Sequence, residues 1–482
     1  MSAALVFAFA GIVLIGVLGF LGRRKPTAEI TEWTVGGRRF GALTMWFLQA
    51  GEIFTTFTFL GMAGLAFSGG VAATYALPYV PLGYLLVFFL ARRLWNLGRR
   101  NGYLTQGDFL EGRYDSRLLG TLAAVLGVVF VLPYLQLQIT GLGLIVKLVT
   151  GDATSSNVSM IVGCVLVVAF VLWSGMRGVA TTSYFKDVIM LVALLLILVM
   201  VPAHFHGGIS GIFQRIQQLH PSSLIVHAGS NDHTWYFTSM LVSAIGVGFM
   251  TLPHTWPALM SARDPRVLRR NYIWIPLYEV LLLVPMLVGF AAVLVLAKGS
   301  NSNAILLTLS KQLLPPWALG LIVVAGIATA MVPAAGILIG ISSLVARNIA
   351  RVRTDRQQVR VNHLTVVVAC GLALLLGIFR PGLLANLLLL TYSGTVQLAP
   401  GNGLAFLRKV PVGKAPVLAG LIVGEIVVIW LTFWETDLFG TFNVGLVGLG
   451  ANLVVLAIAA GIERLAAARA PQPEPGSVET AG

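Results

Sequence analysis

One acidic side chain lies inside a long apolar stretch of the chain. Residues 43–66 read LTMWFLQAGEIFTTFTFLGMAGLA, and Glu52 is the only charged residue among them. A stretch of this length can cross a bilayer, where an ionisable side chain costs about 2.5–3.5 kcal/mol on insertion scales and usually faces a wet cavity. Gly51 precedes Glu52, and hydroxyl side chains follow at Thr55, Thr56 and Thr58. Secondary transporters build substrate sites where helices open at mid-membrane, so this segment indicates transport.

The composition excludes a soluble protein. Of the 482 residues, 57% are hydrophobic and only 10% are charged, which predicts a polytopic membrane protein. The two cysteines, Cys164 and Cys370, lie in apolar runs and fit no metal-ligand spacing. No nucleophile–base or metal-ligand constellation is present, so we expect neither an enzyme nor a cofactor or metal.

The charges of the loops predict the topology. We expect thirteen membrane spans, near residues 3–21, 43–67, 75–91, 119–148, 157–174, 184–202, 236–253, 271–297, 315–345, 364–379, 382–400, 416–434 and 442–462. When alternate loops are assigned to opposite sides, 27 of the 32 Lys and Arg residues fall on one side. The other side keeps only Lys147, Arg215, Lys298, Lys311 and Arg380. The positive-inside rule then places the protein in the inner (plasma) membrane with its N-terminus outside and its C-terminus in the cytoplasm. The net charge of +14 therefore reports topology, and we expect no nucleic-acid partner.

Several spans carry residues that interrupt helices. The fourth span contains Pro133 and the ninth contains Pro333, and such kinks survive in lipid only where freed backbone groups find protein or water. Interrupted helices at matching positions of two halves are typical of an inverted repeat. We expect spans two and seven to form such a pair, each opening a group of five.

Short motifs over about residues 33–400 resemble the sodium:solute symporter family. WTVGGR (33–38) resembles the start of the family's first core helix, and TFLG (58–61) with GLA (64–66) resembles its end. QGDFLEGR (106–113) resembles a cytoplasmic loop, SYFKD (183–187) the inner end of the fifth core helix, and PHT (253–255) a motif of the sixth. Within the family, GEIFTTFTFLG, LPHTWPALMSA, LRRNYIWIPLYE and AMVPAAGILIGISSLVARNI are most similar to the bacterial monocarboxylate permeases.

This resemblance implies a fold and an activity. The fold would be all-α and of the leucine-transporter type, with a 5+5 inverted-repeat core made of spans two to six and seven to eleven. The activity would be symport of short monocarboxylates such as lactate or pyruvate by alternating access. The chain would then divide into a first helix and loop (1–42), the transport core (43–400), two C-terminal helices (401–469) and a disordered cytoplasmic tail (470–482).

One departure from the family concerns the coupling ion. Sodium-coupled relatives offer adjacent Ser or Thr hydroxyls of the eighth core helix to sodium, beside carbonyls of the broken first helix. The matching positions here are Val332 and Pro333, which carry no side-chain oxygen, so the resemblance implies a degenerate sodium site. Glu52 places a carboxyl beside that position, and a partly buried carboxyl can exchange protons near neutral pH. We therefore expect proton coupling with Glu52 as the carrier, the alternative being a structural acid with a permanent proton.

Two other ionisable residues are candidates for ion coupling. Asp187 follows Lys186 at the inner end of span six and is either part of an interfacial salt bridge or a residue on the ion-release route. His254 is either a hydrogen-bonded interface residue or a proton relay.

The candidate substrate pocket gathers polar and aromatic residues from three core spans. A small carboxylate needs hydrogen-bond donors, such as freed N–H groups of an opened helix, more than it needs a full cation. The residues that we expect there are Phe54, Thr55 and Phe57 on span two, Tyr134 and Gln138 on span four, and Tyr392, Ser393 and Gln397 on span eleven. The alternative for each is a hydrogen bond between helices.

The partners expected from the sequence are a small solute, a coupling ion (H⁺ or Na⁺) and the lipid bilayer, and the oligomeric state stays open. A sodium-coupled symporter of another small solute, such as an amino acid or a vitamin, is the nearest alternative. A membrane sensor or a channel is more distant, because the sequence carries no signalling module.

Overall fold

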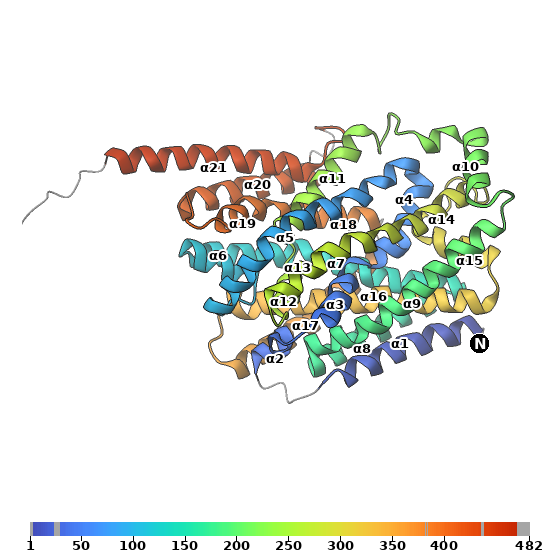
Figure 1. The fold of residues 1–482 in the computed structure, drawn as a ribbon, viewed down its shortest axis with the longest axis horizontal. Coiled ribbons are helices and arrows are strands. Elements are labelled where there is room, and N and C mark those ends of the chain that lie inside the picture. Colours follow the sequence, from blue (N-terminus) through green and yellow to red (C-terminus); the bar gives the residue numbers. More distant parts are fainter. Residues whose placement is uncertain (1–2, 24–28, 381, 383, 435–437, 470–482) are drawn as a thin grey trace, which may run out of the picture.

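The chain folds into a bundle of helices that run mostly side by side along its long axis, as Figure 1 shows. The computed structural model describes residues 3–23, 29–380, 382, 384–434 and 438–469. Among these residues the only strand-like pairing is an isolated bridge between Phe40 and Ala262, which confirms the all-α class. The predicted tail, residues 470–482, lies outside the described residues.

Long helices form the body of the bundle. They are α1 (Ala3–Leu21), α5 (Ala76–Asn101), α7 (Arg117–Thr150), α8 (Ala153–Ser174), α9 (Met176–Ala203), α16 (Pro316–Leu344), α17 (Asp355–Phe379), α20 (Lys414–Phe433) and α21 (Val444–Arg469). Nine helical segments in the described part of the chain are long and apolar enough to cross a membrane. A helix satisfies its own backbone hydrogen bonds, which is why apolar runs of this length adopt it in lipid. Helices α7 and α16 continue through Pro133 and Pro333 without a break.

Four of the predicted spans, namely two, seven, eight and eleven, are divided into shorter helices. Span two consists of α3 (Ala42–Ile53), a π-helix, η2 (Phe57–Gly61), and α4 (Met62–Gly69). Span seven consists of α11 (His233–Gly248) and α12 (Thr255–Met260), and span eleven of α18 (Leu384–Thr395), η8 (Val396–Leu398) and α19 (Ala399–Ala405). Spans two and seven therefore open at residues 54–56 and 249–254. The pieces of a divided span are each too short to be recognised as a full membrane span. The total of thirteen spans and their arrangement as two groups of five spans therefore stay predictions.

The remaining helices connect or extend the spans. The segments α13 (Pro265–Tyr278), η5 (Glu279–Leu282) and α14 (Leu283–Val293) follow one another in span eight. The others are α2 (Ile30–Val35), η1 (Gly36–Arg38), η3 (Gly70–Tyr75), α6 (Gln106–Tyr114), α10 (Gly208–Leu219), η4 (Pro221–Leu224), η6 (Ser302–Ala304), α15 (Ile305–Leu313) and η7 (Val345–Ile349).

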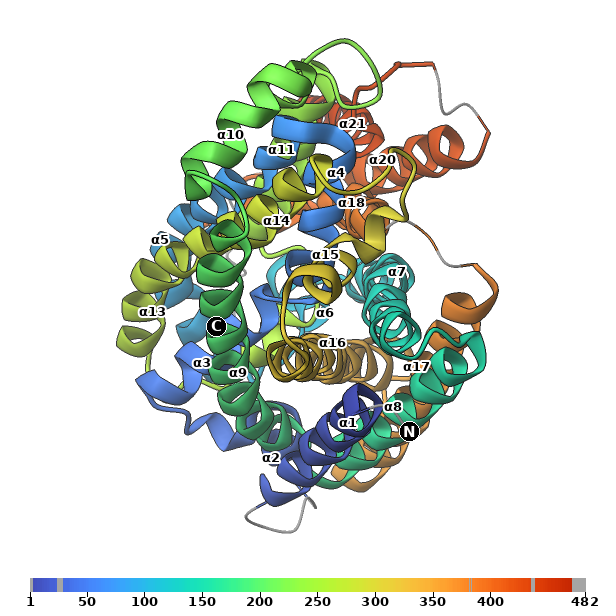
Figure 2. The same cartoon turned by 90° about the vertical axis from the view of Figure 1, so that its right-hand side faces the viewer.

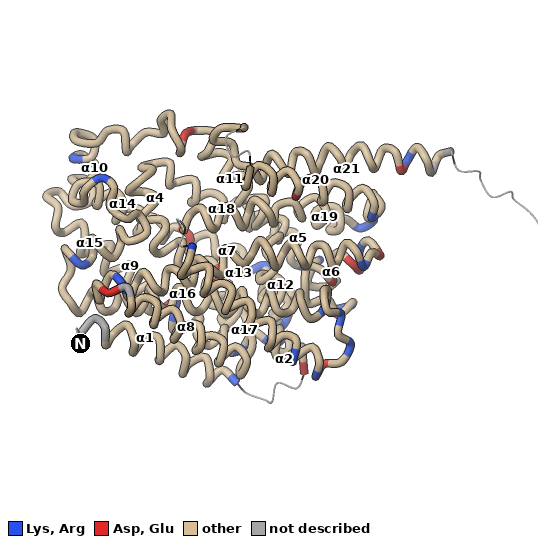
Figure 3. The backbone as a smooth tube through the Cα atoms, turned by 180° about the vertical axis from the view of Figure 1, so that it is seen from behind, with Lys and Arg blue, Asp and Glu red and all other residues tan. Residues whose placement is uncertain are grey.

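Basic residues gather at the end of the bundle where α2 and α6 lie, as Figure 3 shows. Here ion pairs join α6 to the segment that follows α16. Arg347 Nε donates to Asp108 Oδ2 over 2.7 Å, and Arg351 donates through two nitrogens to the two oxygens of Glu111, at 3.2 and 3.0 Å. This clustering at one end agrees with the uneven distribution of Lys and Arg between alternate loops in the sequence.

Helix α16 lies at the centre of the bundle, between α1, α3, α7 and α9, as the end-on view in Figure 2 shows. Every residue in its most apolar window is buried. Small residues allow the neighbouring chain to come close, as is common between membrane helices. A side chain at Gly340 would meet the backbone of His254, and one at Gly336 would lie 3.4 Å from Glu52 Oε1. Helix α16 thereby holds both opened spans in place.

Candidate functional site

The opening of span two exposes backbone groups that side chains of other helices then satisfy. The N–H of Thr56 donates to Gln138 Oε1 on α7 over 3.2 Å. On the other side of the opening, the carbonyl of Gly51 accepts a hydrogen bond from Lys186 Nζ on α9 over 3.2 Å. The N–H of Thr55 donates to Thr58 Oγ1 over 2.7 Å. Each of these bonds replaces a helical bond that the opening removes.

The opening of span seven is satisfied by neutral donors. The carbonyl of Phe249 accepts from Asn402 Nδ2 on α19 over 2.8 Å, and that of Met250 accepts from Trp256 Nε1 over 2.8 Å. Met250 has a φ of 52°, a left-handed conformation that costs a non-glycine residue free energy.

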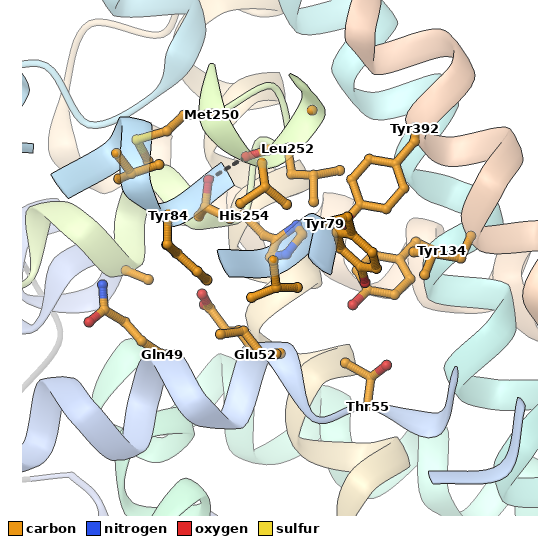
Figure 4. Close-up of a pocket in the computed structure, with 18 of the residues that line it drawn as sticks. Gln49, Glu52, Thr55, Tyr79, Tyr84, Tyr134, Met250, Leu252, His254 and Tyr392 are labelled. Carbon is orange, nitrogen blue, oxygen red and sulfur yellow. Dashed lines mark hydrogen bonds between the residues drawn. The ribbon is translucent and has the colours of Figure 1, made fainter. Parts of the chain in front are cut away.

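A narrow cavity lies between the two openings, with a volume of about 60 Å³. Its wall combines apolar side chains with five tyrosines: Tyr79, Tyr84, Tyr134, Tyr272 and Tyr392. The tyrosine rings support one another, since Tyr84 stacks on Tyr272 at 5.2 Å between centroids and Tyr79 meets Tyr392 edge-on at 6.0 Å. Figure 4 shows several of these rings around one space.

Glu52 points from α3 into this cavity (Figure 4). Among the described residues that line the cavity it is the only carboxylate, and no Lys or Arg lines it. Its Oε1 atom forms no hydrogen bond within the described residues. One turn earlier on α3, Gln49 Nε2 donates to the hydroxyl of Tyr272 over 2.9 Å, which fixes this part of the wall. The cavity therefore combines a single acid with many hydroxyl donors.

The structure brings four of the eight predicted pocket residues to the cavity wall, namely Thr55, Phe57, Tyr134 and Tyr392. His254 also lines the cavity, with its ring 5.6 Å from that of Tyr134 and its Nδ1 atom without a partner in the described structure. The predicted residues of spans two, four and seven thus meet around Glu52.

The other four predicted pocket residues lie behind the wall. Phe54 packs edge-on against Tyr278, at 5.2 Å between ring centroids, and Gln138 is bonded to the N–H of Thr56. On α18, the Ser393 hydroxyl donates to the carbonyl of Leu389 in the same helix or to Asn443 Oδ1, 3.2 Å away, just before α21. Beyond it, Gln397 Nε2 donates to the carbonyl of Gly445 on α21 over 2.8 Å. These residues hold helices together at the edge of the site.

Asp187 lies outside the cavity in a buried ion pair. Its Oδ1 atom is 2.7 Å from Lys186 Nζ, and the two side chains are 1% and 0% exposed. The hydroxyl of Tyr278 donates to the same oxygen over 3.2 Å. This burial argues against the interfacial alternative. Val332 and Pro333 are buried in α16, which packs against both α3 and α9.

Sequence reasoning missed the part that Lys186 and three of the tyrosines play. Tyr79 and Tyr84 on α5 and Tyr272 on α13 look like ordinary aromatic residues of membrane spans, and only the packing turns them toward one cavity. Lys186 gave no signal of its burial, because it lies only two residues inside the predicted span 184–202, whereas in the structure α9 begins ten residues before it, at Met176.

Comparison with known proteins identifies relatives over nearly the whole chain. The sequence model of the sodium:solute symporter family matches residues 33–408. An uncharacterized symporter of Bacillus subtilis (strain 168), YhjB, is 36% identical over 95% of this chain and 96% of its own length. A monocarboxylate transport permease protein of Rhizobium johnstonii is 30% identical over 98% of each chain.

A solved structure shows the same fold. The substrate-bound outward-open state of a Na⁺-coupled sialic acid symporter superposes with a TM-score of 0.78 at 18% identity, over 98% of this chain and 99% of that chain. The likeness confirms the predicted leucine-transporter type of fold. At this identity it carries no information on the ion or the solute.

Proposed function

This chain belongs to the sodium:solute symporter family as a multi-pass membrane transporter, and from that premise we propose that it is a proton-coupled symporter of short monocarboxylates such as lactate or pyruvate. The observation that carries the proposal is Glu52, which is the single carboxylate among the described residues of the cavity wall and has no basic neighbour there. The similarity to a monocarboxylate transport permease supports the substrate class.

Hydroxyl groups are the donors available to a substrate carboxylate. The N–H groups of Thr55 and Thr56, which the opening of span two frees, already donate to Thr58 and Gln138. Recognition of the acid therefore falls to side chains, and we assign it to Tyr134, Tyr392 and the other wall tyrosines together with the Thr55 hydroxyl. Phe57 supplies apolar contact for a short aliphatic chain. Phe54, Gln138, Ser393 and Gln397 position these groups from behind.

The coupling follows from charge. Two carboxylates that share a small, poorly solvated cavity cannot both be ionised without a large cost. Binding of the substrate anion therefore favours the protonated form of Glu52, and a proton on Glu52 favours binding of the anion. Substrate and proton then cross together as an electroneutral pair, and we assign to His254, which lines the same cavity, the role of proton relay.

Uptake into proteoliposomes tests this proposal. With an inward proton gradient and no sodium, we expect the wild type to accumulate a labelled short monocarboxylate above its equilibrium level. Glu52→Gln removes the proton site and keeps the shape, so it should still exchange substrate across the membrane while losing proton-driven accumulation. Accumulation that needs a sodium gradient and survives Glu52→Gln contradicts the proposal.

The same uptake experiment also tests a second candidate function, which is sodium-coupled symport of another small solute such as an amino acid or a vitamin. The family to which the chain belongs favours this alternative. A panel of solutes in sodium-loaded and proton-loaded vesicles separates the two candidates, because only one gradient will drive accumulation.

We place the transporter in the inner membrane with its N-terminus outside and its C-terminus in the cytoplasm. The concentration of Lys and Arg at the end that carries α2 and α6 supports this orientation. Labelling of single cysteines introduced into α6 and α10 should show α6 protected from an impermeant reagent in intact cells and α10 accessible.

A further inference from the structure

The buried pair of Lys186 and Asp187 on α9 lies against the C-terminal end of α3. Lys186 donates there to the carbonyl of Gly51, the residue before Glu52. We propose that the Lys186 ammonium is a resident cation, which fills the position where a mobile metal cation would otherwise bind at the opening of span two. The transporter then needs no sodium. This inference rests on the proposed function and adds to it the residue that determines the coupling ion.

The ammonium occupies a position suited to a cation. The last carbonyls of a helix have no partner within the helix and carry a partial negative charge. In broken membrane helices such carbonyl ends coordinate coupling ions. Here the carbonyl of Gly51, two residues before the last residue of α3, accepts from Lys186 Nζ over 3.2 Å. The Lys186 side chain has no exposed surface, so the charge is held at this point.

Oxygen atoms around the ammonium would suit a hard cation. Asp187 Oδ1 is 2.7 Å from Nζ, and Asp187 Oδ2 forms no hydrogen bond within the described residues. Ser183 lies on the same face of α9, one turn earlier. A side chain built at Gly51 would lie 2.9 Å from Ser183 Oγ and 3.9 Å from Asp187 Oδ2, so both oxygens adjoin the end of α3. Without the ammonium, a carbonyl, a carboxylate and a hydroxyl remain, which are ligands that sodium accepts.

The helices packed against α9 leave Asp187 as the only permanent counter-charge. Helices α1, α14 and α16 carry no ionisable residue in their sequences, and α8 contributes only Cys164. Helices α10 and α15, which also pack against α9, carry only the basic residues Arg215 and Lys311. Helix α13 contributes the Tyr278 hydroxyl, which donates to Asp187, and α3 contributes Glu52, whose side chain faces the cavity. Helix α2 contributes Glu32, which pairs with Arg177. The local charge therefore balances with Lys186 and Asp187 alone, and an added metal cation would leave an excess positive charge in a dry site.

A purely structural role explains the pair poorly. Replacing a buried ion pair by apolar residues is often neutral or stabilising, so such a pair is weak support for a fold. Charges at this depth of a membrane protein are expensive and mark ion pathways. A resident cation gives this pair a function that an apolar pair could not provide.

The decisive variant is Lys186→Ala, which removes the ammonium and keeps the oxygens. We expect proton-driven uptake in sodium-free buffer to be lost, because Asp187 is left buried without its counter-charge. Sodium or methylammonium should restore a measurable part of this uptake, while neither should change uptake by the wild type. The matched control is Lys186→Met/Asp187→Asn, which removes both charges and should give no response to either cation.

Thermal unfolding in detergent gives a second readout that does not require transport. An occupied site predicts a wild-type melting temperature that is equal in sodium and in choline, and a melting temperature of Lys186→Ala that rises with sodium. The proposal is overturned if sodium stabilises the wild type, or if folded Lys186→Ala responds to neither cation. If Lys186→Ala does not fold, the wild-type series alone decides. Absence of monocarboxylate uptake by the wild type would defeat the proposed function and leave this thermal result standing.

Discussion

The two opened spans both leave backbone carbonyl groups without a helical donor, and different kinds of side chain supply the missing hydrogen bonds. The carbonyl groups are those of Gly51 in span two and of Phe249 and Met250 in span seven. The first carbonyl is satisfied by the ammonium of Lys186, the others by the neutral amide of Asn402 and the indole of Trp256. Of the two openings, only the first has a charged donor among the described residues, and that donor lies on its α3 side.

The difference between a charged and a neutral donor predicts different roles for the two openings beside the cavity. An opening held by an ion pair can respond to protons and cations, because its hydrogen bonds change strength with charge. An opening held by neutral donors responds only to packing and hydrogen bonding. We therefore expect the cation and proton sites to reside at span two, while span seven contributes the opposite wall and, through His254, a route for the proton.

The largest effect should come from Asp187→Ala, which leaves the Lys186 ammonium buried without its counter-charge. We expect a loss of about 3–5 kcal/mol in the free energy of unfolding, measured by denaturant unfolding in detergent. The control is Arg263→Ala at the exposed Arg263–Asp264 pair, where the Arg263 side chain is 64% exposed and the cost should stay below about 1 kcal/mol. Equal costs for the two variants would show that burial does not distinguish these pairs.

A smaller effect is expected at the second opening from Asn402→Ala. This change leaves the carbonyl of Phe249 without its donor, at a cost of about 1–3 kcal/mol in unfolding free energy. Because no charge is involved, the loss should be the same in sodium and in choline, and at any pH at which the wild type is folded. A clear dependence of this loss on the cation would remove the contrast between the two openings.

The smallest effect should follow Trp256→Phe, which deletes one N–H and keeps an aromatic ring in place. The carbonyl of Met250 retains a second, longer hydrogen bond from Asn402 Nδ2 at 3.4 Å. We expect a loss of about 0.5–1.5 kcal/mol, seen as a modest drop in melting temperature with uptake preserved. A loss larger than that of Asn402→Ala would mean that Trp256 holds this opening through its ring.

Much of the fold could be predicted from the chain because the bilayer imposes strong constraints. Apolar runs of sufficient length become helices, and the opening of span two was predicted from an acid, a glycine and hydroxyls in one such run. The prolines were a weaker signal. Pro133 and Pro333 lie inside continuous helices, whereas span seven opens at residues 249–254, where Pro253 is accompanied by a left-handed Met250.

The site was predicted less completely, for a geometrical reason. Thr55, Phe57, Tyr134 and Tyr392 reach the cavity, while Ser393 and Gln397 turn toward the segment that begins α21. A helix presents a different face at each residue, and the sequence does not specify which neighbour covers that face. The tyrosines of α5 and α13 were missed for the same reason.

Composition and charge by themselves determined the environment of this protein and the presence of an acid within it. The hydrophobic content required a membrane, the loop charges predicted an orientation, and Glu52 marked the span that opens. Only the tertiary structure decided what surrounds that opening. Helix α9 contacts α3 from more than 130 residues away in the chain, so the bond from Lys186 to Gly51 depends on packing that no local pattern encodes. Local chemistry made the first opening possible, and long-range packing placed a fixed cation in it.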